Sequence, residues 1–60
     1  MTRYLVWFVG AGSRYAVQAE TRKEAIAIFA ESQGVKVSGY IQARILNHFD
    51  DTAGLQRVNF

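Results

Sequence analysis

Residues 15–30 read YAVQAETRKEAIAIFA, and within this stretch the apolar pattern changes its period. Tyr15, Val17 and Ala19 alternate with their neighbours, as expected for a half-buried β-strand. The six apolar residues AIAIFA follow TRKE, which looks like the start of a helix. A helix at a protein surface normally has one polar side, but this run leaves no side polar. A strand that leads directly into a helix predicts a mixed α+β fold, in which the helix is buried against one face of a sheet.

The helix has recognisable signals at both ends. Thr21 and Glu24 have the spacing of a capping box, in which each side chain accepts a hydrogen bond from the other residue's backbone N–H. Gly34 suits the left-handed conformation that often ends a helix. The sequence therefore predicts a helix over about 22–33.

The residues before this stretch predict a β-hairpin over about 3–19. RYLVWFV at 3–9 is rich in β-branched and aromatic residues, and the four residues GAGS separate it from RYAVQA at 14–19. A short glycine-bearing connection between two extended runs is typical of a hairpin. The glycines also resemble the start of a dinucleotide-binding loop, but that loop must open a helix, so we favour the turn.

The residues after the helix fit more than one structure. In 35–46, the apolar residues alternate with period two over a longer stretch than the helical pattern covers. We therefore expect a third strand there, with a helix from Ser38 as the alternative. The segment 47–60 ends in LQRVNF, which fits either a short fourth strand paired with 40–46 or a loose tail. The predicted order is β-β-α-β, in one domain over 1–60, with one helix on a three- to four-stranded sheet. The expected sheet residues of the core are Tyr4, Val6, Phe8, Tyr15, Val17, Val37, Ile41 and Ile45.

Size and composition restrict how the chain is stabilised. Its 60 residues are 50% hydrophobic, carry a formal net charge of +2 and include no cysteine. A chain this short buries only about 60% of its unfolded surface, and without disulfides a partner subunit is the remaining support. The absence of cysteine fits an intracellular, cytoplasmic protein. The apolar run 4–9 is too short for a signal sequence or a membrane span.

No motif for catalysis or metal binding emerges. His48 is the only histidine, and Asp50 and Asp51 beside it are adjacent turn formers rather than a pair of facing carboxylates. The serines lack a histidine with an evident route to them. We therefore expect no enzymatic activity, no cofactor and no metal.

One basic and aromatic constellation remains. The strand pattern places arginine, lysine, glutamine and large aromatic residues on the sheet face that points away from the helix, with no acidic residue among them. Such a face suits a protein partner or single-stranded nucleic acid. The predicted binding residues are Arg3, Trp7, Arg14, Gln18, Lys36, Tyr40, Gln42 and Arg44.

A second surface is predicted from AIAIFA, which has more apolar residues than one helix face can hide. The uncovered residues are expected to meet the C-terminal segment or a second copy, which predicts a homodimer. The residues proposed for this contact are Ile26, Ile28, Ala30, Leu55, Val58 and Phe60.

We therefore expect an accessory binding protein, either a protein-interaction module or a single-stranded nucleic-acid-binding module that uses the same face. As an interaction module it would be an adaptor or an inhibitor of a larger complex. The stretch YAVQAETRKEA at 15–25 resembles a strand-to-helix junction of many small bacterial and phage proteins. This resemblance is consistent with an origin in a mobile element.

Overall fold

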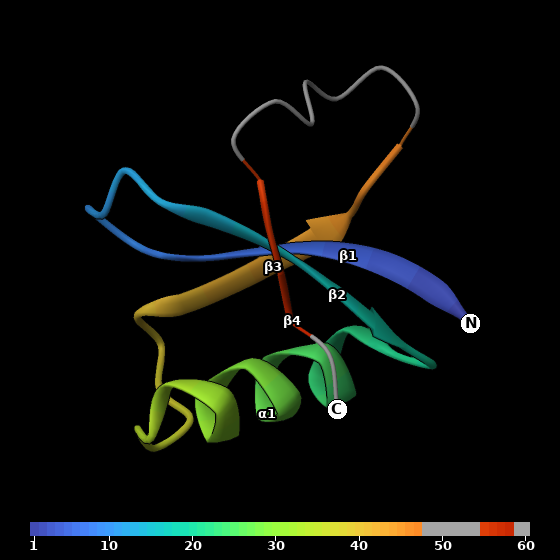
Figure 1. Cartoon of the computed structure of the whole chain (residues 1–60). Coiled ribbons are helices and arrows are strands. Elements are labelled where there is room, and N and C mark those ends of the chain that lie inside the picture. The colour runs from blue at the N-terminus through green and yellow to red at the C-terminus, as the bar shows by residue number, and fades with distance from the viewer. Residues whose placement is uncertain (48–54, 59–60) are drawn as a thin grey trace.

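The computed structural model describes residues 1–47 and 55–58, and it confirms the predicted α+β fold. In chain order the elements are β1 (Thr2–Phe8), β2 (Arg14–Ala19), α1 (Arg22–Gln33), β3 (Ile41–Ile45) and β4 (Gln56–Val58). The sheet has the order β3-β1-β2-β4, with β1 antiparallel to both neighbours and β4 parallel to β2. Helix α1 lies across one face of this sheet (Figure 1).

The core lies between α1 and the sheet and is centred on Phe29. This side chain is fully buried, and its ring packs against Phe8 and Tyr15 at centroid distances of 5.1 and 4.8 Å. Phe8 and Tyr15 are half-buried beside the core, as expected for positions near the hairpin turn. The fully enclosed or nearly enclosed residues around them are Tyr4, Val6, Val17, Ala19, Ala25, Ile26, Ala30, Ile41 and Ala43.

The stretch AIAIFA is almost entirely covered within one molecule. Ala25, Ile26, Phe29 and Ala30 are buried against the sheet, and Ile28 packs half-buried beside them. Within this stretch, only Ala27 is exposed. The far side of the helix therefore presents a single methyl group here, and the monomer covers most of the apolar surface of α1.

The ends of α1 follow the predicted signals. The Glu24 backbone N–H donates to Thr21 Oγ1 (3.1 Å). A capping box has two such hydrogen bonds, and the described contacts include this one alone. Gly34 adopts the left-handed conformation with φ 70°, and the Val35 N–H donates to the Ala30 carbonyl (3.0 Å). These bonds satisfy backbone groups that the helix ends would otherwise leave without partners.

Strand β3 is shorter than predicted and begins only at Ile41. The Val9 N–H donates to the Tyr40 carbonyl (2.7 Å), and β1 has already ended there, so a strand over 35–39 would have no neighbour. Ser38 turns the chain instead. Its Oγ accepts from the Tyr40 N–H (3.3 Å), and its carbonyl accepts from the Ile41 N–H (3.2 Å).

Two residues that were expected in the core are exposed, Val37 by 61% and Ile45 by 59%. Val37 lies in the connection before β3 and is outside the sheet. Ile45 pairs with Tyr4, on the helix side of the sheet. Helix α1 begins at Arg22, and the Arg22 side chain bonds to the carbonyl of Ala43. The helix therefore starts beside Ala43 and does not cover Ile45, which lies two residues farther along β3.

The fourth strand exists, but the predicted pairing with 40–46 is wrong, because β4 pairs with β2 at the opposite edge. The outward edge of β3 is occupied by the Arg22 side chain. Its Nε donates to the Ala43 carbonyl (2.8 Å), and its Nη2 donates to Gln42 Oε1 (3.1 Å). Because both bonds are on the solvent side of β3, a strand cannot pair there without displacing Arg22.

Candidate functional site

The sheet face turned away from α1 is organised by the register of three antiparallel strands. Residues opposite each other share a face of the sheet. Trp7 pairs with Arg14 and Gln42, and Leu5 pairs with Ala16 and Arg44 in the next row. We call this surface the outer face and define it by Arg3, Leu5, Trp7, Arg14, Ala16, Gln18, Gln42 and Arg44.

The register brings together six of the eight predicted binding residues, and it leaves out Lys36 and Tyr40. Both of these lie in the connection between α1 and β3, where the predicted strand does not form. Tyr40 is 72% exposed and sits beside Val9 at the end of the outer face. Lys36 is exposed and lies outside the sheet, so it cannot be counted among the cations of this face.

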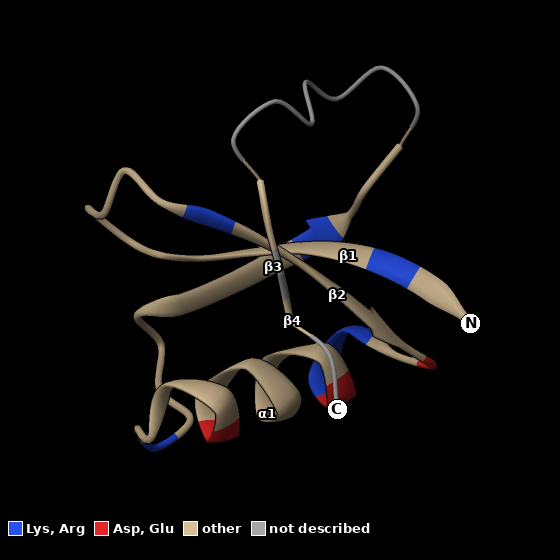
Figure 2. Ribbon diagram, in the orientation of Figure 1, with Lys and Arg blue, Asp and Glu red and all other residues tan. Residues whose placement is uncertain are grey.

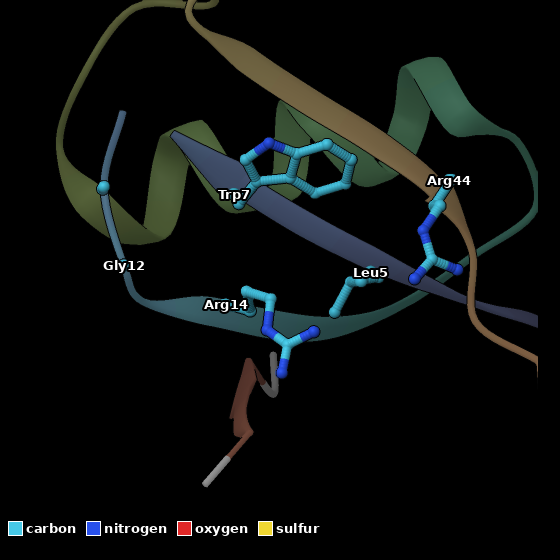
Figure 3. Close-up of a pocket in the computed structure, with 6 residues that line it drawn as sticks. Leu5, Trp7, Gly12, Arg14 and Arg44 are labelled. Carbon is cyan, nitrogen blue, oxygen red and sulfur yellow. The ribbon is translucent and has the colours of Figure 1, made fainter. Parts of the chain in front are cut away.

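Leu5 is only 2% exposed, although no described helix covers the outer face. It forms the floor of a shallow hollow of about 250 Å³. Figure 3 shows Arg14 and Arg44 on either side of Leu5, with the indole of Trp7 beside them. Arginine side chains often lay their apolar stems along such surfaces and keep the charged group in water. The hollow thus combines an apolar floor with a charged rim.

The hairpin turn supplies the remaining wall of the hollow through Ala11 and Gly12. Gly10 has φ 88°, and the Ala11 N–H donates to the Phe8 carbonyl (3.0 Å), which closes the turn. Neither Ala11 nor Gly12 was predicted as a site residue. The signal available in the sequence was their place directly beside the ends of the two strands.

The described acidic residues are confined to one side of the molecule, whereas basic residues lie on both. Figure 2 shows the acidic residues on α1 and at its junction with β2, and basic residues along the strands as well as at the start of α1 and after its end. The side chains of Arg3 and Arg14 make no hydrogen bond or ion pair with another described residue, whereas the Arg44 side chain donates to the Ile45 carbonyl (3.3 Å). The outer face therefore presents a cationic surface to solvent.

Gln42 differs from the other predicted binding residues because both ends of its amide are engaged. Its Oε1 accepts from Arg22, and its Nε2 donates to the Gly39 carbonyl (2.9 Å). The side chain thus ties the start of α1 to the turn before β3. This arrangement indicates a structural role for Gln42 beside Trp7.

The residues predicted for a dimer or tail contact are mostly part of the core. Ile26 and Ala30 are buried, while Ile28 and Val58 pack half-buried against the core cluster. Leu55 is half-buried, and Phe60 lies outside the described residues. The contact between the C-terminal segment and the core, which was one of the two expected arrangements, is therefore present at Val58.

Among residues 1–47 and 55–58, no three potential metal ligands gather, and His48, Asp50 and Asp51 lie outside this part. In the same part of the chain, no helix is long and apolar enough to cross a membrane. Comparison with family models, curated proteins and solved structures found no match for this chain.

Proposed function

We propose that this is a small non-enzymatic protein that binds single-stranded nucleic acid on its outer face. The observation that carries this proposal is the half-buried Trp7 beside Arg14 and Arg44, on a face without a described carboxylate. Aromatic rings on an open sheet stack on unpaired bases, and neighbouring cations contact the phosphates. Both kinds of group are present here within three adjacent strands.

The burial of Leu5 favours a polyanion over a protein as the occupant of this face. Protein interfaces generally have an apolar core from which charged residues are depleted. With Leu5 buried, Trp7 is the large apolar residue with exposed surface among the residues that define the outer face, while Val9 and Tyr40 are exposed only at its end. Arginines make up the rest of its prominent side chains, so its chemistry matches a phosphate backbone better.

Three arginines whose side chains the structure describes set the expected salt dependence. These are Arg3, Arg14 and Arg44 on the outer face, whereas Lys36 lies outside the sheet. Each phosphate neutralised on a single strand contributes about 0.7 to the slope of log affinity against log salt. Three contacts therefore predict a slope of about −2. Little base specificity is expected, because every base has a face that can stack.

The test is a titration of a fluorescently labelled single strand at several salt concentrations, with the wild type, Arg14→Gln and Lys23→Gln. Both variants lose one positive charge, but Lys23 lies on α1, away from the outer face. We expect Arg14→Gln to weaken binding and to reduce the slope by about 0.7, whereas Lys23→Gln leaves both close to wild type. Equal effects of the two variants, or no wild-type binding at low salt, would contradict the proposal.

A protein partner is the second candidate, and exposed apolar residues at the end of the outer face favour it. Val9 is 55% exposed and Tyr40 72%, and the two are joined by a backbone hydrogen bond. Arginine and aromatic residues are also common in protein interfaces. In this case the protein is an adaptor or inhibitor of a larger complex, encoded by a mobile element and acting in the cytoplasm. Capture of partners with and without nuclease treatment separates the candidates, because a protein partner is retained after nuclease.

We also propose that two copies form a homodimer through the exposed apolar residues Val9, Val37 and Tyr40. The core buries Ile26 and Ala30 within one molecule, so we place the contact on other apolar residues rather than on the helix. The three exposed residues support this location because apolar area of this kind often marks an interface.

A further inference from the structure

We infer that the hollow on the outer face is a subsite for one unstacked base, which lies against Trp7 while the neighbouring phosphates lie at Arg14 and Arg44. This inference rests on the proposed function and adds the place where a base is held. It also specifies the form of nucleic acid that is bound, since a base inside a duplex cannot enter such a site without leaving its stack.

The size of the hollow limits its occupant. At about 250 Å³ it is smaller than the 300–1,000 Å³ typical of pockets for drug-sized ligands. Its floor is the apolar side chain of Leu5, and one wall is the turn at Ala11 and Gly12. A single planar ring fits these dimensions better than a bulky or branched ligand.

The positive charges of Arg14 and Arg44 suit a ligand that has an anionic group on each side. Arg14 comes from β2 and Arg44 from β3, and they flank Leu5 from opposite sides (Figure 3). A nucleotide within a strand has a phosphate on either side of its base. A base above Leu5 therefore brings one phosphate toward each guanidinium, and the sheet register sets the backbone positions from which the two arginines extend.

Two glycines allow the hollow to be filled with a matched control. A Cβ added at Gly12 or at Gly39 meets nothing within 4 Å, and neither residue has a positive φ. Only Gly12 lines the hollow. Gly12→Leu thus adds bulk at the subsite, while Gly39→Leu adds the same side chain elsewhere, and neither change removes a charge.

The experiment compares binding of a six-nucleotide thymidine strand with binding of an abasic strand of equal length, measured by anisotropy of a label on the strand. The same length of uridine strand shows whether the site accepts RNA as well as DNA. Stacking of one base is worth about 1–3 kcal/mol, so the wild type is expected to prefer the thymidine strand by about fivefold to 150-fold. Gly12→Leu is expected to lose most of this preference and to bind the abasic strand like wild type, whereas Gly39→Leu keeps both values.

Trp7→Leu provides a second route to the same result, because it removes the stacking ring and keeps an apolar side chain. Equal binding of thymidine and abasic strands by the wild type would overturn the subsite and leave phosphate binding by the outer face intact. A preference that survives both Gly12→Leu and Trp7→Leu would also overturn it. Failure of the wild type to bind either strand at low salt would overturn the proposed function itself.

Discussion

At the scale of single residues, Phe29 and Leu5 show how the two faces of the sheet differ. Phe29 is enclosed by an entire layer of structure, with α1 behind it and the rings of Phe8 and Tyr15 in front. Leu5 is enclosed without a second layer, beside Trp7 and the arginines that line the hollow with it. The first kind of burial supplies stability, whereas the second shapes a surface that can receive a ligand.

Phe29→Ala is expected to remove a large part of the free energy of unfolding. Replacing a buried phenylalanine by alanine costs about 3–5 kcal/mol. A 60-residue domain has only about 3–9 kcal/mol of unfolding free energy. Urea denaturation followed by far-UV circular dichroism measures the loss. Ala27→Gly, at the exposed position of the same helix, serves as the control and should cost about 1 kcal/mol through helix propensity alone. A similar loss for the two variants would contradict the central role of Phe29.

At the scale of elements, the two edges of the sheet are protected in different ways. Strand β4 forms one edge and is only three residues long. Strand β3 forms the other edge, where Arg22 binds the outward carbonyl of Ala43. Short edge strands and charged side chains at an edge both hinder pairing with another molecule. Both edges are therefore poorly suited to strand addition, which is why the dimer is proposed through side chains.

Arg22→Ala is expected to open the β3 edge. The substitution removes the hydrogen bonds to Ala43 and Gln42, so the outward backbone groups of β3 become available for pairing. Sedimentation velocity should then show species larger than a dimer that the wild type does not form. Lys23→Ala removes the same charge from the next residue and should behave like wild type. An unchanged sedimentation profile for Arg22→Ala would show that this side chain does not guard the edge.

At the scale of the whole molecule, the arrangement is asymmetric. The helix covers one face of the sheet and carries most of the described acidic residues, while the arginines of the outer face lie on the other side (Figure 2). The apolar residues Val9, Val37 and Tyr40 lie at and beyond the end of the strands. A dimer through this end would leave the arginines of both copies accessible.

The homodimer predicts a dependence on protein concentration. Association stabilises the folded state by mass action, so the thermal midpoint should rise as the concentration increases. Tyr40→Ser removes apolar area from the proposed contact without altering the core, and it should weaken the dimer in sedimentation equilibrium. A profile that shows only monomer at high micromolar concentration would exclude this assembly.

Several features followed from local patterns and were predicted correctly. The helix bounds come from Thr21 and Gly34, whose capping preferences act within a few residues. The hairpin comes from two alternating runs around a glycine turn. The outer face also follows from period-two alternation, so Arg3, Trp7, Arg14 and Arg44 share it once the strands are known.

The sequence by itself determined the helix, the hairpin, the α+β class and which side of each of the first two strands is polar, because these depend on neighbours close along the chain.

Only the tertiary structure decided where β3 begins, where β4 pairs and how Leu5 is covered. Residues 35–39 alternate like a strand, but β1 ends before it can pair with them. Strand β4 pairs with β2, while the Arg22 side chain lies at the outward edge of β3. The alternation of β1 predicts that Leu5 is exposed. It is the buried floor of the hollow because three strands place Trp7, Arg14 and Arg44 around it. Each of these outcomes depends on contacts between segments far apart in the sequence, which no local pattern encodes.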